Sequence, residues 1–152
     1  MSSKLNQQLA EVTSFIKKGD QLNLKVSDKG TYWHLDHSLQ VLNGISETLT
    51  NSNPEDYQPK FSLPKFIIMN TGFIPRGKGR APKQTIPEGG ISEEKLLSDL
   101  DKIKNATKDL NNLAENKNFK HPLFGYLNRM DTIKFMAIHT QHHLKIMRDI
   151  VK

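Results

Sequence analysis

The sequence predicts an all-α fold, an up-and-down four-helix bundle with a long irregular central connection. Four stretches of the 152-residue chain place apolar side chains at the spacing of one helix face. The connection over residues 51–91 is much longer than the other two. Amphipathic helices of this kind pack around a common core, and this chain length is typical of one domain. We therefore expect a single domain spanning residues 1–152.

The first two helices are expected over residues 3–18 and 31–50. Gly19 ends the first apolar run, and the turn-forming sequence from Asn51 to Pro54 ends the second. The residues that share a helix face are Leu5, Leu9, Val12, Phe15 and Ile16 in the first stretch, and Trp33, Val41, Leu42, Ile45 and Leu49 in the second. Each stripe is wide enough to face a core.

The central region is expected to combine a short helix with a long loop. Ser62 and Pro64 suit the N-cap and the first turn of a helix over residues 62–72. Residues 73–91 carry many glycines and prolines, which predicts an irregular loop. Loops of this length in compact domains are usually functional or disordered.

Two further helices complete the predicted bundle. Ser92 is a suitable N-cap, two glutamates follow it, and an apolar stripe continues to about residue 115. Residues 121–127 contain turn residues and aromatic side chains and are expected to form a connector. Asn128, with Asp131 three residues later, predicts the start of the last helix, which runs to the C-terminus.

Composition excludes several kinds of site. The chain has no cysteine, so a metal would need histidine or carboxylate ligands. The N-terminus has no apolar signal segment and no apolar run approaches the roughly 20 residues that span a bilayer, so we expect a cytoplasmic protein without membrane contact. The net charge is +6, but most lysines and arginines are spread along helix faces, so nucleic acid is not an expected partner.

The last helix carries three histidines within five residues. His139 and His143 are four residues apart and therefore lie one turn apart on the same face. Because successive helical residues turn by about 100°, both belong to the apolar face and His142 lies toward the polar rim. In the second helix, His34 and His37 can both face the bundle, and helical spacing alone leaves the choice between them open.

Three inward histidines from two helices predict a divalent-metal site. Neutral imidazole suits Zn²⁺ and other borderline ions, and three protein ligands leave a position for water or substrate. The alternative is that these histidines are core residues hydrogen-bonded to their neighbours, without a metal. Asp36 points about 100° away from His37, so a surface position is expected for its carboxylate.

The long loop concentrates positive charge among its glycines and prolines. We interpret Arg76, Lys78 and Arg80, followed by Lys83, as a clamp for a carboxylate or phosphate of a substrate or thiol cofactor. The alternative is a solvated loop without a ligand. The glycines do not form a dinucleotide-binding motif, because no strand precedes them and the motif is incomplete.

Four segments together resemble proteins of the DinB-like superfamily. They are Trp33-His-Leu-Asp-His37-Ser-Leu, the loop from Ile74 to Pro82, His121-Pro-Leu-Phe-Gly125, and the terminal stretch from His139 to Ile146. The resemblance spans nearly the whole chain. It is greatest to a branch of uncharacterised bacterial proteins that carry a His-Pro-x-Phe-Gly segment before the last helix.

This resemblance implies a four-helix bundle, often dimeric, with a divalent metal held by three histidines. Matched by position, they are His37, His139 and His143. His37 is matched in preference to His34 because the family histidine is typically followed by a small or polar residue and a leucine. Several members of the superfamily are transferases or isomerases that use low-molecular-weight bacterial thiols, so the resemblance also implies a small-molecule substrate. Because members are often dimeric, it implies a homodimer as well.

Two functions are consistent with these features. The first is a metal-dependent transferase or hydrolase, in which Zn²⁺ or Ni²⁺ on the three histidines activates a low-molecular-weight thiol or a water molecule. A metal-bound thiol is deprotonated and becomes a nucleophile. The second is a non-catalytic helical bundle that binds a structural metal or a partner.

Overall fold

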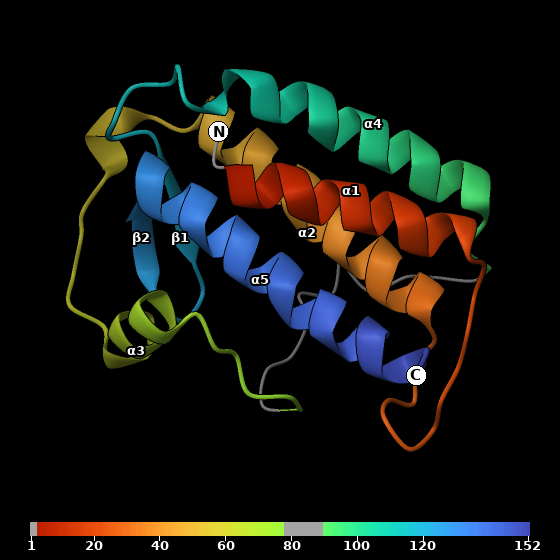
Figure 1. Cartoon of the computed structure of the whole chain (residues 1–152). Helices are drawn as coiled ribbons and strands as arrows, with labels where there is room; N and C mark the ends of the chain where they lie inside the picture. Colours follow the sequence, from red (N-terminus) through yellow and green to blue (C-terminus); the bar gives the residue numbers. More distant parts are fainter. Residues whose placement is uncertain (1–2, 78–89) are drawn as a thin grey trace.

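Residues 3–77 and 90–152, which the computed structural model describes, fold mainly into helices (Figure 1). The elements are α1 (Ser3–Lys17), α2 (Thr31–Asn51), the 3-10 helix η1 (Pro54–Asp56), α3 (Leu63–Thr71), α4 (Glu93–Leu110), β1 (Asn118–His121), β2 (Gly125–Asn128) and α5 (Arg129–Ile150). The predicted mainly helical class is confirmed, with a small hairpin added.

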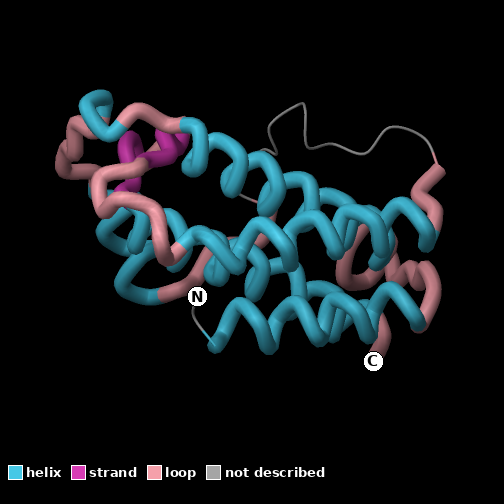
Figure 2. The backbone as a smooth tube through the Cα atoms, turned by 90° about the horizontal axis from the view of Figure 1, so that it is seen from above, coloured by secondary structure: helices cyan, strands magenta, loops and turns pink. Residues whose placement is uncertain are grey.

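The four longest helices pack together around one apolar core (Figures 1 and 2). Helix α2 contacts α1, α4 and α5, and α1 also contacts α4 and α5. The largest fully buried side chains are Leu5, Leu9, Ile16, Leu35, Leu39, Leu42, Leu49, Leu96, Leu100, Ile103, Leu110 and Leu127. Burial of one such side chain contributes about 1.5–3 kcal/mol, so this core is the main favourable term in folding.

Helices α2 and α4 run in the same direction. Lys95 of α4 pairs with Asp36, and Asp99 one turn later accepts a hydrogen bond from Asn43 further along α2. Strict up-and-down alternation is therefore absent at this step. The long connection permits this arrangement, because the end of α2 and the start of α4 lie at opposite ends of the bundle (Figure 1).

The first turn of α2, which carries the second-helix histidines, is held by the preceding loop. Its N-cap residue Gly30 has no side chain to cap the helix. Instead, Asp20 Oδ1 accepts a hydrogen bond from the backbone of Tyr32 at 3.0 Å, and Thr31 donates its backbone N–H to Gln21 O at 2.8 Å. The loop from α1 thereby fixes where α2 begins.

A β-hairpin occupies the segment that we expected to be a connector. Strands β1 and β2 pair antiparallel, with Phe119 opposite Leu127 and His121 opposite Gly125. The strands have four residues each, too few for a two-residue alternation to be recognised in the sequence. Gly125 has a φ of 72°, which favours glycine at this turn.

His121 closes the hairpin turn. Its Nδ1 accepts hydrogen bonds from the backbone N–H groups of Leu123 and Phe124, at 3.0 and 3.1 Å. Its ring stacks on Phe124 with centroids 3.9 Å apart and meets the edge of Phe135 on α5. The histidine of the His-Pro-x-Phe-Gly segment therefore joins the turn to the last helix.

Most helix ends follow the predicted capping residues. Ser62, Ser92 and Asn128 each accept a hydrogen bond from a backbone N–H in the first turn of the helix that follows. Helix α4 is shorter than predicted, because the chain leaves it at Leu110 through two tight turns instead of continuing to about residue 115.

Replacing Gly30 by alanine is expected to destabilise the fold. An added Cβ would lie 2.6 Å from Asp20 Oδ1 and 3.0 Å from Gln21 O, so the capping carboxylate would be displaced. We expect a loss of about 1–2 kcal/mol in the free energy of unfolding, measured by urea denaturation.

Gly44→Ala is the matched control, because a Cβ at Gly44 in the same helix meets nothing within 4 Å. Alanine is favoured over glycine inside a helix by about 1 kcal/mol, so this variant should be more stable than the wild type. Equal stability of the two variants would contradict the role given to Asp20.

Candidate metal centre

The facing sides of α2 and α5 bring three predicted ligands together. His37 comes from α2, and His139 and His143 come from successive turns of α5. One ring nitrogen from each can be chosen so that all three lie within 4.8 Å of one another. The ring centroids are 5.3 Å apart for His37 and His139, 4.8 Å for His37 and His143, and 4.7 Å for His139 and His143.

Aromatic and apolar side chains surround this cluster. His37 is 4% exposed and His143 is 7% exposed. The indole of Trp33 stacks on the ring of His37, with centroids 5.2 Å apart and an interplanar angle of 18°. The ring of Phe135 lies 6.0 Å from that of His139. These aromatic rings cover part of the imidazole surface and so limit the access of water to it.

Burial keeps the histidines of α5 neutral. It lowers the pKa of His139 to about 3, and the nearby imidazoles of His37, His142 and His121 lower it further in the same direction. The pKa of His143 lies well below its usual value, first because of burial and then because of the neighbouring histidines. Neutral imidazole is the form that binds metals.

The cluster fits a divalent metal ion. Nδ1 of His139 is buried and has no hydrogen-bond partner, an arrangement that costs free energy unless a ligand completes it. The nitrogens lie within 4.8 Å of one another, so binding of one ion would require the three rings to move closer together. Three protein nitrogens leave at least one coordination position for water or a substrate.

His34 has a different environment from His37. Its Nδ1 lies 3.0 Å from Nδ1 of His143, and its Nε2 lies 3.0 Å from Ser27 Oγ. Both ring nitrogens therefore have partners inside the protein. The structure groups His37 rather than His34 with the α5 pair, a choice that helical spacing had left open.

His142 lies at the rim, as predicted. It is half-buried, its ring meets that of His143 edge-on at 5.0 Å, and it forms a hydrogen bond to the backbone of Ile74. Burial and the positive charge of Arg76 lower its pKa. Ile74, just before the basic loop, therefore lies beside the turns of α5 that carry the histidines.

Of the predicted anion clamp, Arg76 is placed beside the cluster. Its guanidinium pairs with Asp149 on α5, with Nη2 and Oδ2 2.8 Å apart, and its charge contributes to the lowered pKa of both His34 and His142. Lys78, Arg80 and Lys83 lie outside the described residues.

Asp36 is buried, and the surface position expected for it is wrong. It is 1% exposed and accepts a hydrogen bond from Lys95, which also pairs with Asp99 at 2.8 Å. The direction away from His37 was predicted correctly, but α4 covers that side of α2. Asp36 therefore joins α2 to α4.

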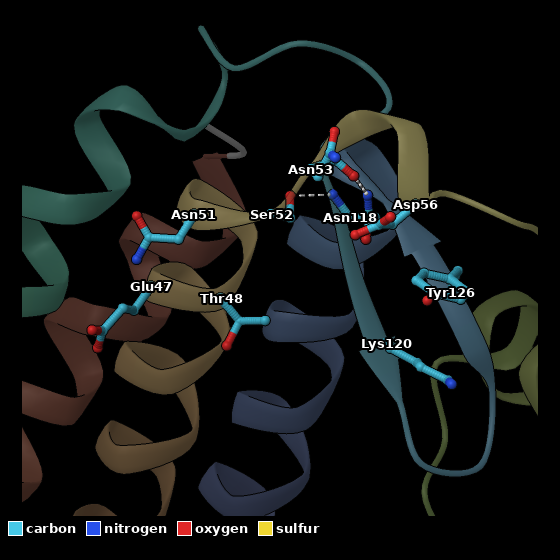
Figure 3. Close-up of a pocket in the computed structure, with 9 residues that line it drawn as sticks. All are labelled: Glu47, Thr48, Asn51, Ser52, Asn53, Asp56, Asn118, Lys120 and Tyr126. Carbon is cyan, nitrogen blue, oxygen red and sulfur yellow. Dashed lines mark hydrogen bonds between the residues drawn. The ribbon is translucent and has the colours of Figure 1, made fainter.

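A polar pocket of about 490 Å³ lies elsewhere, between the C-terminal part of α2 and the hairpin (Figure 3). It is lined by Glu47, Thr48, Asn51, Ser52, Asn53, Asp56, Asn118, Lys120 and Tyr126. Glu47 is ten residues beyond His37, which is about 15 Å along the helix axis. The pocket is thus separate from the histidine cluster.

Comparison with protein-family models, with curated proteins and with solved structures gave no match. Among the described residues, no helix combines the length and apolar character needed to cross a membrane. The chemistry of the site therefore rests on its own residues.

The metal-free protein is expected to lose stability as the pH falls from about 6.5 to about 4. Burial lowers the pKa of His34 to about 4 and that of His139 to about 3, whereas histidine in an unfolded chain titrates near 6.5. The unfolded chain therefore takes up protons first, and the free energy of unfolding decreases over this range.

Urea denaturation at a series of pH values measures this decrease. His139→Phe removes one of the buried titrating groups, so its stability should decline less steeply with falling pH than that of the wild type. Parallel pH profiles for the two proteins would contradict the assignment.

Proposed function

We propose that this protein is a metal-dependent enzyme whose Zn²⁺ or Ni²⁺ ion is held by His37, His139 and His143. The observation that carries the proposal is the convergence of three imidazoles within 4.8 Å of one another on facing sides of two helices. Among the described residues, the group that converges here consists of imidazoles and contains no carboxylate. Imidazole suits borderline ions, whereas Mg²⁺ and Ca²⁺ prefer oxygen ligands.

The proposed reaction is a transfer or hydrolysis on a small molecule. A bound metal would supply the means to deprotonate a low-molecular-weight thiol or a water molecule at neutral pH. The chain itself contributes two neutral α5 imidazoles, the stacked pair of Trp33 and His37 that limits water, and the positive charge of Arg76 at the rim. Arg76, together with Lys78 and Arg80, would bind an anionic group of the substrate or thiol.

The same proposal assigns the chain to the DinB-like superfamily, with α1, α2, α4 and α5 as a four-helix bundle whose middle pair is parallel. Two features support it. The ligands come from the second and the last of the long helices, and the last helix supplies two of them at a spacing of four residues.

The homodimer that the resemblance implies belongs to this proposal as well. Large apolar side chains are exposed on α3 and beside it, namely Phe61, Leu63, Phe66, Ile67 and Phe73. Contiguous exposed apolar surface commonly marks an interface between proteins. Sedimentation of the purified chain, whose own mass is 17.3 kDa, would distinguish the dimer from the monomer.

The alternative function is a non-catalytic bundle with a structural metal or a bound partner. It is favoured by the burial of the cluster. It is also favoured because Nδ1 of His143 and both ring nitrogens of His34 already have partners within the protein. A structural zinc site has four protein ligands, whereas a catalytic one keeps an open position. The number of protein ligands therefore separates the two functions.

Protein purified without a histidine tag is expected to bind one equivalent of Zn²⁺, Ni²⁺ or Co²⁺. His143→Ala removes a ligand and should reduce the metal content, by elemental analysis, to well below half an equivalent. His142→Ala is the matched control, because this neighbouring histidine lies at the rim and should leave the content unchanged. Equal metal content in wild type and His143→Ala would rule out the proposed ligand set.

An open coordination position predicts that thiols bind directly to the metal. Adding mercaptoacetate or β-mercaptoethanol to the Co²⁺-loaded protein should produce a thiolate-to-metal absorption band. Arg76→Ala should weaken the binding of the anionic mercaptoacetate several-fold and leave that of the neutral thiol unchanged. Absence of the band with both thiols would favour the structural metal site.

A further inference from the structure

His34 lies next to the proposed ligands without belonging to them. It is 5% exposed, so solvent reaches little of its ring. One ring nitrogen faces Nδ1 of His143 and the other faces Ser27 Oγ, each at 3.0 Å. Ser27 is held in place by a hydrogen bond from the backbone N–H of Lys29 to its hydroxyl, at 3.1 Å. The proposed function leaves this chain of contacts without a role.

A hydrogen bond between two Nδ1 atoms requires one of them to carry the proton and the other to offer a lone pair. The ring that accepts at Nδ1 is neutral and carries its single proton on Nε2. Two arrangements are therefore possible, one with His143 as the donor and one with His34 as the donor.

The two arrangements have opposite consequences for metal binding. When His34 donates, the proton of His143 sits on Nε2 and its Nδ1 lone pair is already used, so His143 has no nitrogen for a metal. When His143 donates, its Nε2 lone pair is free. The proton of His34 then sits on its own Nε2 and is donated to Ser27 Oγ. A metal-binding His143 requires this second arrangement.

We propose that His34 is a positioning residue of the metal centre, which accepts the Nδ1–H of His143 and so directs the Nε2 lone pair of His143 at the metal. Ser27 completes the arrangement by accepting the Nε2–H of His34. The inference rests on the proposed metal function of His143. It assigns a task to the loop between α1 and α2, which otherwise contributes no ligand.

The nature of this acceptor affects the reactivity of the metal. Ligating histidines commonly donate to a carboxylate, a backbone carbonyl or water, and a carboxylate raises the basicity of the ligand. A neutral imidazole donates less charge to His143 than a carboxylate would. The metal therefore retains more of its positive charge to act on a bound thiol or water.

Metal affinity of three full-length variants tests the inference. His34→Phe removes the acceptor and should weaken Zn²⁺ binding about 10–100-fold in competition with a chelator, while the stoichiometry stays at one. His34→Asn places an amide oxygen near the position of Nδ1 and should retain most of the affinity. Ser27→Ala should cause a smaller loss, because His34 keeps its contact with His143.

The proton positions can be observed directly in the Zn²⁺-loaded wild type. A long-range proton–nitrogen correlation spectrum should show His143 protonated on Nδ1 with Nε2 bound to the metal, and His34 protonated on Nε2. Urea denaturation of the metal-free variants shows whether each variant is folded. If His34→Phe does not fold, the spectrum of the wild type and the metal affinities of His34→Asn and Ser27→Ala still test the inference.

Three results would overturn the inference. His34→Phe could bind Zn²⁺ as tightly as the wild type, or His143 could bind the metal through Nδ1. His34→Phe could also change the Co²⁺ spectrum in the same way as His37→Ala, which would make His34 a ligand. The first two results leave the proposed function intact, whereas the third would give the metal four protein ligands and favour the structural site. A wild type that binds no metal would end both the inference and the proposed function.

Discussion

The antiparallel contact between α2 and α5 is the constraint on which the rest of the structure depends. It sets His37 against His139 and His143, and His34 against His143, within a single interface. Both helices also contribute buried apolar side chains to the core cluster, including Leu35, Leu39 and Leu144. The site and the core are therefore parts of one packed surface, and a shift of either helix would disturb both.

The second constraint is the need of buried imidazole nitrogens for partners. His121 accepts two backbone hydrogen bonds, His142 contacts the backbone of Ile74, and His34 is held between His143 and Ser27. Nδ1 of His139 is the exception among the hydrogen bonds described, since it is buried without a partner. A cluster that was only structural would gain from satisfying this nitrogen, which is why the exception favours a ligand.

How much the sequence could predict depended on how each helix is covered. From His139 onward the buried residues of α5 follow one face, so spacing correctly placed His139 and His143 inward and His142 at the rim. Helix α2 is covered by three other helices, and its buried residues include His34, Asp36 and His37 in all directions. Helical phase carries little information for such a helix, and both the choice between His34 and His37 and the burial of Asp36 needed the packing. The parallel course of α4 also depends on contacts between distant residues, and the hairpin strands are too short to be recognised by alternation.

The parallel course of α2 and α4 sets a lower limit on the length of the chain between them. Helix α2 has 21 residues and is about 31 Å long, so a return to its start needs about nine extended residues. The natural connection from Ser52 to Ser92 contains several times that number. Most of it is therefore surplus to the topology, including α3 and Arg76, and evolution could reshape this surplus, and with it the approach to the histidines, without repacking the core.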